Sequence, residues 1–165
     1  MKKLCISCVV ILILTWISFP CVAQDKTYRI EILQVTNNDP FEYCIEGFLK
    51  ELESNGIVQG KNLTINRRII DFDVEKGGLW KKVGVLLRIK KEASLIVEAR
   101  PDLVLTIGTP ATRYAKDKIV GAGIPLVFTA VAIPEAAGGT SLTQAGPGFT
   151  GASLYMDTAS FLQIT

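Results

Sequence analysis

A short turn, residues 108–112 (GTPAT), holds the side chains and amides best placed for chemistry. It follows an almost wholly apolar run and opens a helical pattern. Thr109 is a suitable N-cap, and Pro110 fits the first helical position. The backbone N–H groups of Ala111 and Thr112 would then have no acceptor within the helix. The first turn also has no acidic residue to offset the positive end of the helix dipole. A carboxylate or similar anion could accept hydrogen bonds from these amides and from the hydroxyls of Thr109 and Thr112.

The same turn also suits an ordinary capped helix whose free amides face water, and the residues alone leave the two interpretations level. Neither a phosphate-loop motif nor a glycine-rich dinucleotide fingerprint occurs in the chain, so a nucleotide ligand is not indicated.

The chain contains no histidine, which excludes Ser-His-Asp and Cys-His catalysis and most zinc sites. Ser153 does not form a nucleophile elbow, because the second glycine of that motif is absent. We therefore expect no enzyme activity, no cofactor and no metal. The remaining catalytic alternative is carboxylate chemistry through the acids Asp39, Glu42, Asp71 and Asp73.

Residues 1–23 have the layout of a secretory signal peptide: Lys2 and Lys3, an apolar run, and small residues before Gln24. We expect export, cleavage and no membrane span afterwards. Cys44 is then the single remaining cysteine, so no internal disulfide framework is expected. Loss of the two lysines would leave sixteen basic and sixteen acidic residues, and we expect no nucleic-acid partner.

The rest of the chain alternates strand-like and helix-like segments, which predicts an α/β fold: a three-layer parallel sheet with helices on both faces. The strands are expected at Tyr28–Thr36, Asn62–Phe72, Leu103–Ile107, Ile124–Val131 and Phe149–Tyr155. The helices are expected at 41–52, as one long helix or two within 75–100, from Ala111 to Ile119, and from Asp157 onward. The helix within 75–100 should bury Leu79, Val83, Leu86, Leu87, Ala93, Ile96 and Val97.

In the common strand order 2-1-3-4, a crevice opens at the carboxyl ends of the first and third strands. The loops 36–40, 108–112 and 129–134 would converge there. Asp39 and Glu42 could meet a ligand ammonium across this crevice, although acids at the start of a helix also stabilise its dipole.

Four segments together resemble the substrate-binding proteins of ABC transporters, in the group that includes binders of tryptophan and other aromatic amino acids. The segments are EILQVTNNDPFEYCIEGFLKELESNGIVQGKNLTI, PDLVLTIGTPATRYA, GIPLVFTAVAIPEAAG and GFTGASL. The resemblance implies a type I periplasmic-binding-protein-like fold of two α/β lobes. It assigns residues 24–165 to the N-terminal lobe of a chain truncated before the second lobe. By the same resemblance the ligand-binding positions are Thr36, Asn37, Asp39, Thr109, Pro110, Ala111, Thr112, Thr129, Ala130 and Val131.

From the resemblance and the signal peptide we expect a periplasmic solute-binding component of an ABC importer. Its ligand would be a small carboxylate-bearing molecule such as an amino acid, and its partners the permease and ATPase subunits. Two alternatives stay open: the ligand-sensing domain of a membrane signalling protein, and a small exported α/β enzyme.

Overall fold

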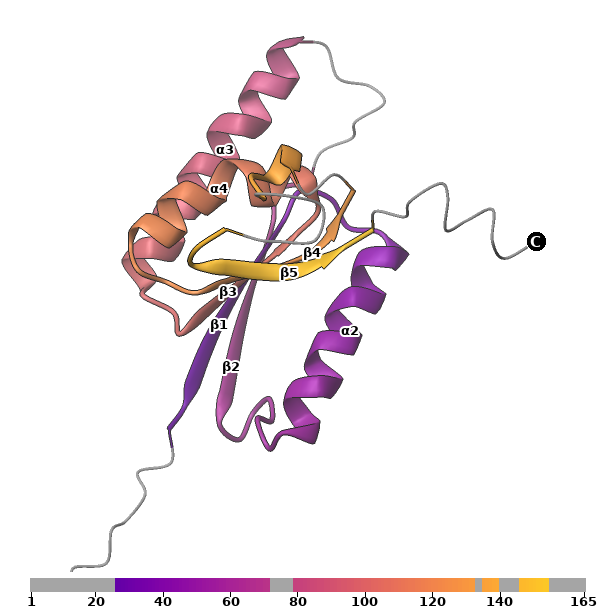
Figure 1. The fold of residues 1–165 in the computed structure, drawn as a ribbon, viewed down its shortest axis with the longest axis vertical. Helices are drawn as coiled ribbons and strands as arrows, with labels where there is room; N and C mark the ends of the chain where they lie inside the picture. Colours follow the sequence, from indigo (N-terminus) through magenta and orange to yellow (C-terminus); the bar gives the residue numbers. More distant parts are fainter. Residues whose placement is uncertain (1–25, 72–78, 133–134, 140–145, 155–165) are drawn as a thin grey trace, which may run out of the picture.

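The computed structural model describes residues 26–71, 79–132, 135–139 and 146–154, and the fold is drawn in Figure 1. The leader, Asp73, the first residues of the 75–100 segment, residues 133–134 and the helix expected from Asp157 all lie outside these ranges. In the described part of the chain, none of the helices combines the length and apolar character needed to cross a membrane.

Five parallel strands form one sheet in the order β2-β1-β3-β4-β5, which confirms the predicted α/β class and strand order. The strands are β1 (Tyr28–Gln34), β2 (Leu63–Ile69), β3 (Leu103–Ile107), β4 (Leu126–Val131) and β5 (Phe149–Ser153). The helices are α2 (Asp39–Ser54), α3 (Leu79–Ala99) and α4 (Thr109–Gly121), with a short 3-10 turn η1 (Glu135–Ala137).

Helix α2 covers one face of the sheet, and α3 and α4 cover the other (Figure 1). Because successive side chains of a strand point to opposite faces of the sheet, each inner strand contributes side chains to the packing on both faces. Ile30 and Ile32 of β1 pack with Ile45 on the α2 side, whereas Leu33 packs with Ile96 on the α3–α4 side. The sheet therefore has two separate apolar cores, and β3 is buried in both of them.

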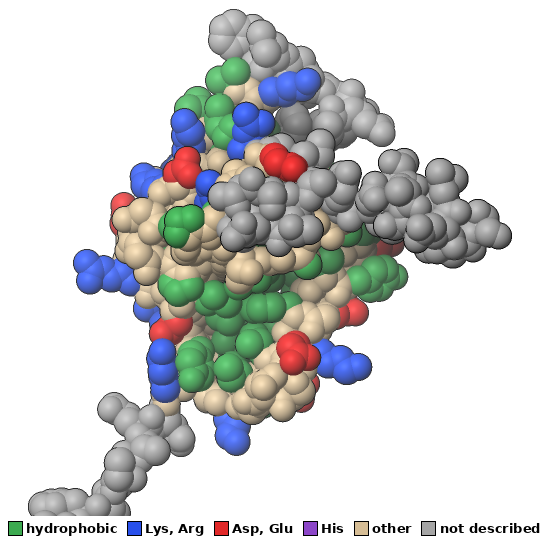
Figure 2. Space-filling view, viewed as in Figure 1, with side chains coloured by type: hydrophobic (Ala, Val, Ile, Leu, Met, Phe, Trp, Pro, Cys, Tyr) green, Lys and Arg blue, Asp and Glu red, His purple; other side chains and the backbone are tan. Residues whose placement is uncertain are grey.

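The α2 side is less completely covered than the other face. Leu103 and Val127 are only partly buried there, and a groove of about 500 Å³ at the amino ends of β3, β4 and β5 is lined by residues of both cores. Hydrophobic side chains gather in the middle of the face that Figure 2 shows.

The predicted core face of α3 is wrong at Val83 and Leu87. Val83 is 42% exposed and Leu87 is 61% exposed, whereas Ile89, Ala93 and Ile96 are fully buried. A helix of 21 residues is about 31 Å long, and β3 with 5 residues is about 17 Å long. The first turns of α3 extend past the strands (Figure 1), so the sheet cannot bury them.

Candidate functional site

Loops from three strands meet at the carboxyl edge of the sheet, as the predicted strand order requires. The backbone N–H of Gly108 donates to the carbonyl of Thr129 at 2.9 Å, which joins the end of β3 to β4. The ring of Phe41, in the first turn of α2, packs on Gly108: a Cβ added there would lie 3.2 Å from its Cζ. The segments after β1, β3 and β4 therefore form one continuous surface.

Thr109 is not the N-cap of α4, contrary to the sequence prediction. The cap is Gly108, whose φ of 86° is a left-handed conformation that glycine adopts without strain. Thr109 is already helical, and its hydroxyl oxygen accepts from the N–H of Ala132 at 3.1 Å. A hydroxyl that accepts one bond still carries its own hydrogen, so half-buried Thr109 can donate to a ligand.

The expectation that the amide of Thr112 is free to face the crevice is also wrong. The Thr112 N–H donates to the carbonyl of Gly108 at 3.2 Å, and its hydroxyl bonds the same carbonyl at 3.0 Å. The hydroxyl of Thr106 lies 2.9 Å from that of Thr112, and Ala111, Thr112 and Thr106 are all fully buried. Thr112 therefore satisfies polar groups inside the core and offers no atom to a solute.

The predicted residues at the end of β4 are also mostly covered. Val131 is fully buried, and Ala130 is 7% exposed, with a φ of 55° that is unusual for a residue with a side chain. The pairing of β4 with β5 shifts register between Phe128 and Val131, so the strand bends at Ala130. Half-buried Thr129 remains within reach of a solute.

The loop after β1 is held by a hydrogen-bond network centred on Arg67 of β2. The Arg67 guanidinium donates to Gln34 Oε1 at 2.9 Å, to Asn37 Oδ1 at 2.9 Å, and to both carboxylate oxygens of Glu42. Gln34 is fully buried and donates onward to the carbonyl of Thr36 at 2.8 Å. The loop therefore reaches the crevice in a fixed conformation.

Glu42 is committed to this network. Hydrogen bonding to Arg67 holds the pKa of its carboxyl below the usual 4.5. Because its charge is already paired with Arg67, Glu42 is a poor partner for a ligand ammonium. Asp39, one turn earlier on α2, is exposed and is the acid that can still serve in that role.

Sequence reasoning missed Arg67, although a signal was present. Arg67 shares the face of β2 that carries Leu63 and Ile65, and a charge within an apolar series needs a partner when it is half-buried. Of the ten predicted positions, those with exposed or half-buried atoms are Thr36, Asn37, Asp39, Thr109, Pro110 and Thr129.

Within the described ranges, no three carboxylate, thiolate or imidazole side chains gather closely enough to hold a metal ion.

No family model matches the chain. A curated relative, the tyrosine-binding protein of Clostridioides difficile strain R20291, is 28% identical over 140 residues, which are 84% of this chain and 36% of that protein. Among solved structures, the open, ligand-free form of a substrate-binding protein with adhesive properties from Clostridium difficile is 26% identical. It matches with a TM-score of 0.67 over 84% of this chain and 42% of its own.

An ABC domain from Streptococcus pneumonia, solved with L-Trp, shares the fold with a TM-score of 0.60 at 20% identity. It covers 78% of this chain and 39% of its own. The chain thus spans less than half the length of each of these proteins.

Proposed function

We propose that this chain, which is similar to substrate-binding proteins in sequence and in fold, is the extracytoplasmic solute-binding component of an ABC importer. In this proposal residues 1–23 direct export to the periplasm, and permease and ATPase subunits receive the solute. The protein performs no catalysis of its own. The observation that carries the proposal is the match to a tyrosine-binding protein over 84% of the chain.

The proposed ligand is an amino acid or a similar small carboxylate, bound at the carboxyl edge of the sheet. Two features of the edge support it. The Thr109 hydroxyl has a hydrogen to donate, at the positive end of a helix whose first turn has no acid. Asp39 is exposed at the neighbouring helix start and suits an ammonium.

The direct test is ligand-observed NMR with L-tyrosine at millimolar concentration, compared with N-acetyl-tyrosine and with tyramine. We expect L-tyrosine to bind best, because the first analogue lacks the ammonium and the second lacks the carboxylate. Thr109→Val should weaken L-tyrosine binding roughly tenfold or more, the usual effect of losing a hydrogen bond to a charged group.

Thr109→Ser is the matched control, because it keeps both the hydroxyl and the bond to Ala132. Thr109→Val should weaken the binding of tyramine less than that of L-tyrosine, because tyramine has no carboxylate for Thr109 to contact. Equal binding of L-tyrosine by the Val and Ser variants would remove Thr109 from the site. Absence of binding by amino acids and other small carboxylates would refute the proposed ligand class.

A further inference from the structure

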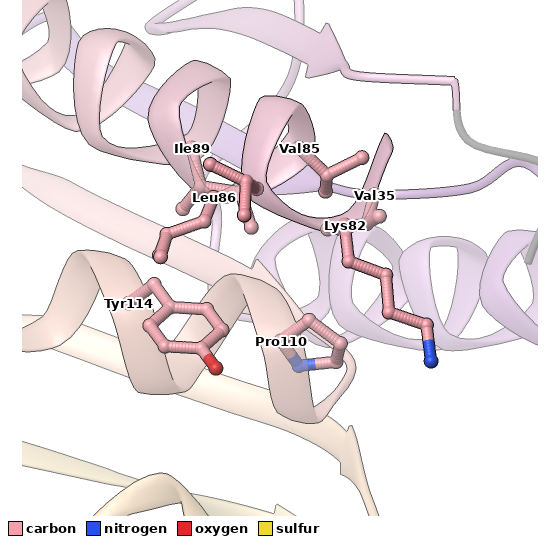
Figure 3. Close-up of a pocket in the computed structure, with 8 residues that line it drawn as sticks. Val35, Lys82, Val85, Leu86, Ile89, Pro110 and Tyr114 are labelled. Carbon is pink, nitrogen blue, oxygen red and sulfur yellow. The ribbon is translucent and has the colours of Figure 1, made fainter. Parts of the chain in front are cut away.

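A pocket lies between α3 and α4, on the face of the sheet opposite α2 (Figure 3), and Pro110 is the one predicted crevice residue that lines it. Its volume is about 370 Å³, within the usual range for small-molecule sites. Buried Val35 and Ile89 form its floor. Leu86 from α3 and Tyr114 from α4 approach each other across it, and exposed Pro110 lies at one end.

The pocket exists because α3 extends beyond the sheet. The first turns of α3 have no strand beneath them, and they leave an apolar cleft against the start of α4. Val83 and Tyr114 at this cleft are 42% and 39% exposed. Adjoining exposed apolar side chains beside a pocket are a common mark of a ligand site.

The polar groups at the pocket are cationic or neutral. The Lys82 side chain lines the pocket and extends alongside Pro110 (Figure 3). The guanidinium of Arg113 lies 5.6 Å from the centre of the Tyr114 ring. No Asp or Glu is among the described residues that line the pocket, so its mouth favours a negative charge.

We propose that this pocket binds a small amphipathic carboxylate, an alkyl or aryl chain that ends in one carboxyl group. The chain lies between Leu86 and Tyr114 over Val35 and Ile89. The carboxylate pairs with Lys82 at the open end. This site is separate from the proposed amino-acid crevice, with which it shares only Pro110, so it gives the protein a second ligand.

The test uses octanoate as the probe, with 1-octanol and n-octylammonium as its neutral and cationic analogues, titrated by ligand-observed NMR. We expect octanoate to bind about fivefold more tightly than 1-octanol, the scale of one exposed charge pair, and octylammonium to bind least. Lys82→Gln should lower the affinity for octanoate to the affinity for 1-octanol. Lys91→Gln is the matched control, since nine residues of helix place Lys91 on the opposite side of α3.

Leu86→Trp fills the cleft and should abolish binding of octanoate. Val83→Trp, at the exposed rim, is a second filling variant if the first disturbs the fold, which far-UV circular dichroism reports. L-tyrosine binding should be unchanged in both variants, which separates this site from the crevice. Undiminished octanoate binding in the filled variants, no octanoate binding to the parent chain, or no effect of Lys82→Gln would each overturn the proposal.

Discussion

Gly108 is the residue on which the geometry of the carboxyl edge depends most. Its φ is 86°, its N–H donates to the carbonyl of Thr129, and a Cβ would meet the Phe41 ring in a tight contact at 3.2 Å. Gly108→Ala should therefore lower the free energy of unfolding by about 1–2 kcal/mol, the cost of a left-handed non-glycine residue together with a close contact. Urea denaturation of both proteins measures the difference.

Gly47→Ala is the control for this prediction. Gly47 is exposed inside α2, and a Cβ there meets nothing within 4 Å. Alanine in a helix interior should raise the free energy of unfolding by about 0.5–1 kcal/mol. If Gly108→Ala proved as harmless as Gly47→Ala, the conformation of the turn described above would be wrong.

At the residue scale, the sequence predicted the turn at residues 108–112 between β3 and α4 but not which of its threonines is buried. Thr112, Ala115 and Ile119 repeat at intervals of three and four residues, and all three are fully buried. That spacing could have placed Thr112 in the core before the structure was known. The bond from Ala132 to Thr109 joins residues far apart in the chain, and no local pattern predicts it.

Among the elements, α2 and β2 are joined by the ion pair of Glu42 and Arg67, beside the apolar contacts between them. The pKa of Glu42 is lowered in the folded protein, so the pair contributes stability above the unfolded pKa, near 4.5. This contribution is lost as the pH falls through the folded pKa. The difference in unfolding free energy between the parent and Glu42→Gln should therefore be constant from pH 7 to about pH 5 and shrink toward zero in more acidic solution.

Chemical denaturation over a pH series measures this effect. Glu46→Gln, an exposed acid on the same helix outside the network, should show a much smaller dependence. If the difference in unfolding free energy between the parent and Glu42→Gln grew as the pH fell, the pKa of Glu42 would not be lowered by folding.

Sequence patterns were enough to predict the order of the strands but not the buried face of every helix. The alternation of strands and helices, with the right-handed crossover rule, predicted the order that places β1 beside β3. The faces of α3 were predicted less well, because a hydrophobic stripe does not report how far the sheet extends. Val83 and Leu87 continue the apolar pattern of α3 beyond the sheet that would have buried them.

At the scale of the whole molecule, the expected ligand affinity depends on how much of its relatives' length the chain covers. The matched region is 36% of the tyrosine-binding protein and 42% of the substrate-binding protein of known structure. The expectation that this region is the first of two lobes rests on the resemblance and stays a prediction. In that arrangement the loops at the carboxyl edge form one wall of the binding site, and closure on a ligand requires another wall.

A solute held by one wall loses about half of its contacts, and it keeps its exposure to water on the other side. We therefore expect the 165-residue chain to bind L-tyrosine with a Kd no tighter than about 1 mM, equivalent to about −4 kcal/mol. An NMR titration measures it, with the full-length tyrosine-binding protein of Clostridioides difficile as the positive control. A low-micromolar Kd would mean that the six reachable residues at the edge already form a complete site. Octanoate affinity should not depend on a second wall, because all the described residues that line the α3–α4 pocket come from α3, α4 and the residue directly after β1.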